Sequence, residues 1–129
     1  MGNRYLDWFR QAKADLRHAR NAAEDGDYEW SCFAAQQAAE KAIKALFQKS
    51  GMEAWGHTLT ALIGNIPVKG GVSKDLVNCA KLLDKHYIPT RYPNGFDSGA
   101  PTDFYTEEEA RRAIECAEGI IEFCRHQVE

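Results

Sequence analysis

The sequence lacks several features that would mark a membrane, secreted or metal-dependent protein. No apolar run approaches the roughly 20 residues of a membrane span, and the first residues contain no apolar signal segment. The spacings of a zinc site, a Walker phosphate loop and a Ser-His-Asp hydrolase are also missing. We therefore expect a cytoplasmic protein without a membrane segment, a metal ion or a cofactor.

Cysteine and net charge are low as well. The four cysteines, at positions 32, 79, 116 and 124, include no Cys-x-x-Cys pair and are predicted to be buried thiols rather than disulfides or metal ligands. A net charge of -3 argues against a nucleic-acid binder that uses its whole surface, but it allows a local basic site. With 129 residues, the chain is expected to form one domain, residues 1–129.

What the sequence does contain is helical periodicity. No stretch alternates at period two, so no strand is predicted, whereas apolar residues recur at three- and four-residue spacing. The predicted helices span residues 3–25, 28–50, 57–63, 73–87 and 106–127. Short links between them favour an antiparallel, all-α bundle. Its expected core consists of Phe9, Leu16, Ile43, Leu46, Leu62, Leu83, Ile114, Ile120 and Ile121.

The predicted helix over residues 28–50 carries polar residues where a plain core helix would not. At about 100° per residue, Gln36 falls in the middle of its apolar face and Glu40 at the edge. Gln37 and Lys44 lie further round. Because buried polar groups need partners, Gln36, Gln37 and Glu40 are predicted to form a polar network with other segments.

Three further regions carry polar residues of interest. The longest irregular stretch, residues 88–105, is rich in Pro and Gly and contains Arg91, and long loops in compact domains are often functional. His57 precedes the short third helix and is expected to be a loop or cap residue. The first helix carries a basic stripe that is either a solvated flank or a phosphate-facing ridge. This stripe consists of Arg10, Lys13, Arg17 and Arg20.

Two blocks of sequence resemble a known family. They read Gln-Gln-Ala-Ala-Glu-Lys at 36–41 and Tyr-Ile-Pro-Thr-Arg-Tyr-Pro at 87–93. With His-Thr-Leu at 57–59 and Tyr-Thr at 105–106, nearly the whole chain resembles the HEPN domain, a nucleotide-binding domain of higher eukaryotes and prokaryotes, in its stand-alone prokaryotic form. The resemblance implies a five-helix, up-and-down antiparallel bundle that forms a homodimer. Such members are often encoded beside a minimal nucleotidyltransferase, and many of these pairs act as toxin and antitoxin.

The family resemblance also bears on activity. Ribonuclease members carry Arg, then four to six residues, then His; this chain has no such pair, and His86 and Arg91 stand in the reverse order. The sequence therefore favours a non-catalytic module that binds a nucleotide or RNA phosphate, docks a nucleotidyltransferase, or does both. Arg91 would contact the anion, because a guanidinium matches phosphate geometry, and Tyr87 or Tyr92 would stack on a base. The candidate site residues are Arg91, Tyr92, His86, Tyr87 and Lys44.

Three alternatives stay open. In the first, Arg91 pairs with Glu40 and its neighbouring tyrosine packs under the loop, so that both residues are structural. In the second, the protein is a metal-independent ribonuclease toxin in which His86 is the general base and Arg91 stabilises the reacting phosphate. In the third, the protein is a purely structural dimer partner that binds no ligand. Three Trp residues in a small helical chain are consistent with an interface.

Overall fold

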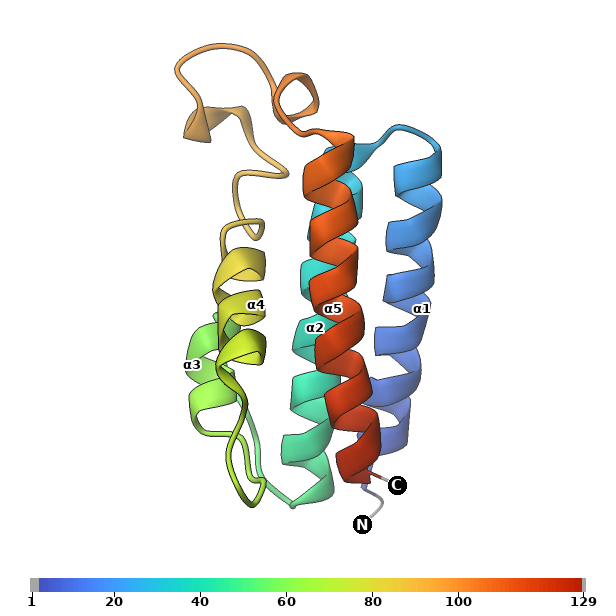
Figure 1. Cartoon of the computed structure of the whole chain (residues 1–129), viewed down its shortest axis with the longest axis vertical. Helices are drawn as coiled ribbons and strands as arrows, with labels where there is room; N and C mark the ends of the chain where they lie inside the picture. The colour runs from blue at the N-terminus through green and yellow to red at the C-terminus, as the bar shows by residue number, and fades with distance from the viewer. Residues whose placement is uncertain (1–2, 129) are drawn as a thin grey trace.

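A computed structural model describes residues 3–128 of the chain. Over that range the protein contains five α-helices and no β-strand, which confirms the predicted all-α bundle (Figure 1). The helices are α1 (Tyr5–Glu24), α2 (Tyr28–Lys49), α3 (Leu59–Gly64), α4 (Lys74–Asp84) and α5 (Glu107–Val128). Two short 3-10 helices, η1 (Pro93–Gly95) and η2 (Pro101–Asp103), interrupt the link between α4 and α5.

The long helices run up and down beside one another (Figure 1). A tight turn joins α1 to α2, and α5 packs against both of them. The shorter α3 and α4 cover the side of the bundle away from α1, and the 88–105 link extends beyond one end (Figure 1). The polar turn at this end of the α1–α2 hairpin includes Gly26, whose φ of 83° favours glycine.

The bundle core is built around the alanines of α2. Their small side chains let the neighbouring helices approach closely, and those that are fully buried are Ala35, Ala38, Ala39, Ala42 and Ala45. Eight of the nine predicted core residues are buried; Ile114 is half-buried and packs against the core edge. The 3.6-residue period therefore identifies the inner face of each long helix correctly.

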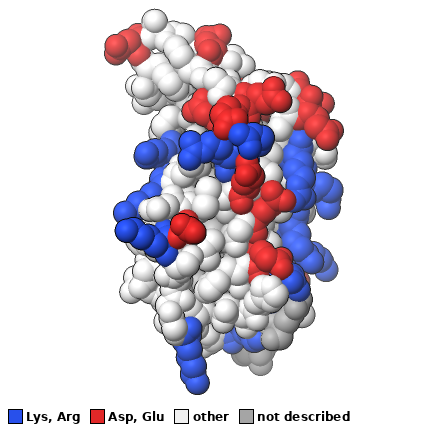
Figure 2. Space-filling model, in the orientation of Figure 1, with Lys and Arg blue, Asp and Glu red and all other residues white. Residues whose placement is uncertain are grey.

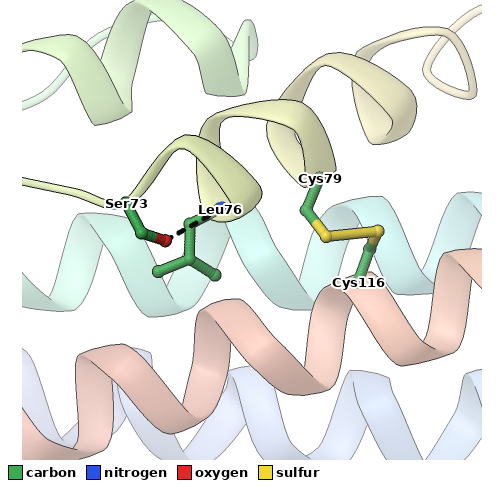
Figure 3. Close-up of a disulfide and its surroundings, with 4 residues drawn as sticks. All are labelled: Ser73, Leu76, Cys79 and Cys116. Carbon is green, nitrogen blue, oxygen red and sulfur yellow. Dashed lines mark hydrogen bonds between the residues drawn. A yellow bond between two sulfur atoms is a disulfide. The ribbon is translucent and has the colours of Figure 1, made fainter.

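Side-chain caps mark the N-termini of α4 and α5. Ser73 caps α4, its Oγ accepting a hydrogen bond of 3.2 Å from the Leu76 amide (Figure 3). Thr106 and Glu109 form the capping box of α5, since each side chain accepts from the backbone amide of the other. The prediction that the fourth helix reaches Tyr87 was wrong, because α4 ends at Asp84. Pro89 disfavours helical backbone at the residue before it, which helps to explain the early end.

The cysteine prediction was half wrong. Cys32 and Cys124 are buried free thiols, as expected, and burial raises the pKa of each to about 12. Cys79 and Cys116, in contrast, form a disulfide between α4 and α5 (Figure 3). Their Cα atoms lie 5.0 Å apart although 37 residues separate them in sequence. The packing of α4 against α5 brings the two cysteines together, and their spacing in the sequence does not predict the disulfide.

Candidate functional site

Arg91 lies among aromatic rings at the turn that follows α4. Its guanidinium carbon is 4.4 Å from the ring centre of Phe33 on α2, 4.6 Å from that of Tyr87 and 5.2 Å from that of Tyr92. The Nε–H group donates to the Tyr87 carbonyl at 2.9 Å, which fixes the plane of the guanidinium. Within residues 3–128, Arg91 forms no ion pair with a carboxylate. The site therefore presents a half-buried, uncompensated cation in an aromatic frame.

Glu40 lies next to this frame and has three side-chain partners. Its carboxylate oxygens are 3.0 and 3.1 Å from Nδ1 of His57, and it accepts from Lys44 Nζ at 3.1 Å and from Gln36 Nε2 at 3.2 Å. The His57 ring stacks on Tyr87, with centres 4.6 Å apart and planes 18° apart. His57 thus joins the buried carboxylate of α2 to the ring that also contacts Arg91.

A chain of hydrogen bonds runs from the polar side chains of α2 to α1. Gln36 is fully buried and donates to the His57 carbonyl at 3.2 Å, while its own oxygen accepts from Gln37 at 2.8 Å. Gln37 accepts from Lys41 Nζ at 3.2 Å, and Lys41 pairs with Asp15 of α1 at 2.6 Å. This chain of bonds satisfies the buried amide and links the site to the α1–α2 hairpin.

A small cavity of about 400 Å³ opens beside the His57 and Tyr87 rings. It is lined by His57, Thr58, Asp84, Lys85, Tyr87, Ile88 and Pro89. Asp84, the last residue of α4, accepts hydrogen bonds from the first amides of α3, at 2.6 Å from Leu59 and 3.1 Å from Thr60. The carboxylate of Asp84 therefore positions α3, and with it His57, against the end of α4.

The structure places the other predicted site residues as follows. Tyr92 is 49% exposed, Tyr87 is half-buried, and Lys44 is largely covered and engaged with Glu40. His86 is buried at 7% exposure, with its ring edge-on to Tyr105 at 5.5 Å, and its Nδ1 atom has no hydrogen-bond partner within residues 3–128. Burial lowers the pKa of His86 below its usual 6.5, against a smaller opposing effect of Glu109. The ring contact of His86 is thus with Tyr105, on a buried side of the chain, rather than with one of the three rings around Arg91.

Two contacts correct or extend the sequence interpretation. Glu40 is paired with Lys44 and His57, so the alternative in which Arg91 neutralises Glu40 was wrong. Phe33 and His57 belong to the site, yet neither was predicted as a site residue. Phe33 lies one helical turn before Gln37 on the same, partly exposed side of α2. This spacing could have indicated that Phe33 lies near the polar residues of the site.

The basic stripe on α1 divides into two parts. Arg20 pairs with Glu118 of α5 at 2.5 Å. The other three cations and Lys41 line an open groove of about 850 Å³ along α1. Figure 2 shows Lys and Arg side chains gathered along the α1 edge, while Asp and Glu run down α5. The α1 edge is thus a local basic surface on a protein whose net charge is negative.

Metal-binding clusters and membrane-spanning helices are both absent from the described part of the chain. No group of three or more His, Cys, Asp or Glu side chains in residues 3–128 is placed to hold a metal ion. Over the same range, no helix is both long enough and apolar enough to cross a membrane. The candidate site brings together one guanidinium, four aromatic rings including His57, and the Glu40 network.

Comparison with known proteins gives a consistent result. A family profile described as the HEPN domain matches residues 5–127. The crystal structure of TT1696 from Thermus thermophilus is similar, with a TM-score of 0.94 and 46% identity over 97% of this chain and 98% of that one. An archaeal HEPN homologue, ST0689, superposes with a TM-score of 0.84 and 41% identity over 100% of both chains. "Putative toxin MJ1304" of Methanocaldococcus jannaschii is 25% identical over 124 residues, covering 89% of this chain and 82% of its own.

Proposed function

This chain belongs to the HEPN domain family, and from that premise we propose that it is a binding module that holds the phosphate of a nucleotide or RNA at Arg91. One observation carries the proposal: the Arg91 guanidinium lies within 5.2 Å of three aromatic rings and has no carboxylate partner within residues 3–128. A half-buried cation without a counter-ion favours an anionic ligand. The aromatic rings around it suit a base, which stacks on such surfaces.

Within this proposal, each candidate residue has a role that its contacts support. The Nε atom of Arg91 is held by the Tyr87 carbonyl, so its two terminal nitrogens remain for a bidentate contact with phosphate oxygens. Tyr92 is the most exposed of the three rings and is the stacking surface for the base. Lys44 adds positive charge at the Glu40 end of the site. His86 supports the turn from below, where its carbonyl accepts from the Thr90 hydroxyl at 2.7 Å.

Binding is favoured over RNA cleavage. A general base must reach the proton that it removes, and the imidazole of His86 is buried beneath the turn. The ribonuclease alternative based on His86 and Arg91 therefore has less support than the binding module. A purely structural dimer partner would leave the Arg91 cation without a ligand, and it predicts no nucleotide binding at all.

The proposal is tested by titrating labelled AMP and a short RNA against four proteins: wild type, Arg91→Ala, Arg91→Lys and Arg111→Ala. Arg111 is the matched control, because it is an exposed arginine paired with Glu108 and Glu115 on α5. We expect Arg91→Ala to weaken binding at least tenfold, Arg91→Lys to recover part of the loss, and Arg111→Ala to bind like wild type. Affinity should fall as salt rises. Equal binding by wild type and Arg91→Ala, or no binding by either, would overturn the proposal.

The biological setting follows from the family and from one relative. A similar protein in Methanocaldococcus jannaschii carries the name of a toxin. We propose that this chain acts in a toxin–antitoxin type of pair with a minimal nucleotidyltransferase as partner, that it is a cytoplasmic protein, and that it forms a homodimer. Trp55 at 82% exposure and Trp30 at 48% support an interface, since exposed aromatic residues are enriched where proteins associate.

A further inference from the structure

The disulfide between Cys79 and Cys116 differs from the other two cysteines in its access to solvent. Both of its residues are half-buried, whereas Cys32 and Cys124 are fully buried. A thiol must be reachable and must form a thiolate to exchange; Cys32 and Cys124 are fully buried, and this burial also raises their pKa and disfavours the thiolate. Any thiol–disulfide chemistry of this protein is therefore confined to the Cys79–Cys116 pair.

This disulfide links α5 to α4, which has the fewest buried residues of the four longer helices. Only Ala80 and Leu83 of α4 are buried, whereas α2 contributes fourteen buried residues and α5 contributes six. Cys79 lies next to Ala80 and is bonded to Cys116 of α5 (Figure 3), and the Leu76 side chain lies close to Gly119 on the same helix. The covalent bond from α4 to α5 is thus a main restraint on a helix with few buried side chains, so its loss should loosen α4 before the rest of the bundle.

The end of α4 holds both sides of the candidate site. Asp84 is the last residue of α4, and its carboxylate anchors the first turn of α3 through Leu59 and Thr60. Three residues later, Tyr87 stacks on His57 and accepts the hydrogen bond from Arg91. Movement of α4 would therefore displace the Arg91 guanidinium and the His57 ring together.

We propose that Cys79 and Cys116 are a reversible dithiol–disulfide pair through which the surrounding thiol pool controls the order of the Arg91 site. On oxidation, one thiolate of the pair attacks a low-molecular-weight disulfide such as oxidised glutathione and releases one glutathione thiol. The second protein thiolate attacks the mixed disulfide, forms the Cys79–Cys116 bond and releases the second glutathione thiol. Two electrons and two protons pass from the protein dithiol to glutathione, and reduction reverses the steps.

The test compares wild type with the Cys79→Ser, Cys116→Ser variant, each equilibrated with oxidised or reduced glutathione. Hydrogen exchange is followed over residues 57–60 and 85–92, with residues 28–49 of α2 as the internal control. Reduction should speed exchange at least tenfold at the two site segments of wild type, while α2 stays better protected than both segments in each buffer. It should also lower the melting temperature by roughly 10 °C, since the bond closes a loop of 37 residues. The variant should behave like reduced wild type in both buffers.

The outcomes separate this inference from the proposed function. Equal exchange at residues 85–92 in oxidised and reduced wild type would overturn the redox control, whatever the protein binds. The same would follow if mass spectrometry after thiol alkylation found the pair reduced in oxidised glutathione. The effect of reduction on AMP affinity rests on the proposed function and is measured separately. If AMP binds neither form while exchange responds to reduction, the nucleotide proposal fails and the redox control stands.

Discussion

Removal of the Glu40 carboxylate should destabilise the protein more than removal of any exposed acidic residue. Glu40 is 5% exposed and accepts from Lys44, Gln36 and His57. In Glu40→Ala, the Lys44 ammonium, whose side chain is 12% exposed, loses its only carboxylate within residues 3–128, while Gln36 keeps its bond to the His57 carbonyl. A fully buried broken pair costs about 3–5 kcal/mol. Because His57 is half exposed, we expect a smaller loss, about 2–3 kcal/mol.

The measurement is urea unfolding followed by far-UV circular dichroism for wild type, Glu40→Ala, Glu40→Gln and a control, Glu115→Ala. Glu115 pairs with Arg111 at 2.7 Å on the exposed face of α5, and such surface pairs contribute less than about 1 kcal/mol. Glu40→Gln keeps an acceptor for Gln36 and should lose about half as much as Glu40→Ala. A free energy of unfolding for Glu40→Ala within about 0.5 kcal/mol of wild type would refute the structural role of the network.

Two further predictions concern pH and assembly. Burial holds the pKa of His86 below 6.5 in the folded state, so the unfolded chain binds the proton first and stability should fall as pH drops below about 6.5. His86→Phe should flatten that part of the melting-temperature profile between pH 5 and 8, and identical profiles for the two proteins would contradict the assignment. Light scattering at micromolar concentration should give twice the mass of one chain, and the mass of a single chain would exclude the homodimer.

The fold was predictable because its determinants are local. Helical periodicity, the Ser73 and Thr106 caps and the turn residues all act within a few positions of one another. The unusual position of Gln36 on α2 was also visible in the sequence. Helical periodicity alone places this residue on an apolar face, without knowledge of the helices that pack against it. The same periodicity predicted the number and order of the helices, which the structure confirms, and the family profile confirms the resemblance to the HEPN domain.

The unpredicted contacts all join distant segments. Glu40 meets His57 across 17 residues, and Cys79 meets Cys116 across 37. Such pairings depend on how helices rotate and slide when they pack, and local patterns such as helical periodicity do not reveal it. Ile114 illustrates the same limit: its helical phase is correct, but it lies at the edge of the core rather than inside it.

The most direct test of ligand binding at Arg91 is an NMR titration that observes arginine side chains. Nε–H of Arg91 is bonded to the Tyr87 carbonyl, and Nε–H of Arg111 is bonded to Glu108 at 3.1 Å, so both signals should be protected and visible. On addition of AMP to ¹⁵N-labelled protein, the Arg91 signal should shift in a saturable manner while the Arg111 signal stays in place. No shift of Arg91 up to millimolar AMP, or equal shifts of both signals, would contradict a phosphate site at Arg91.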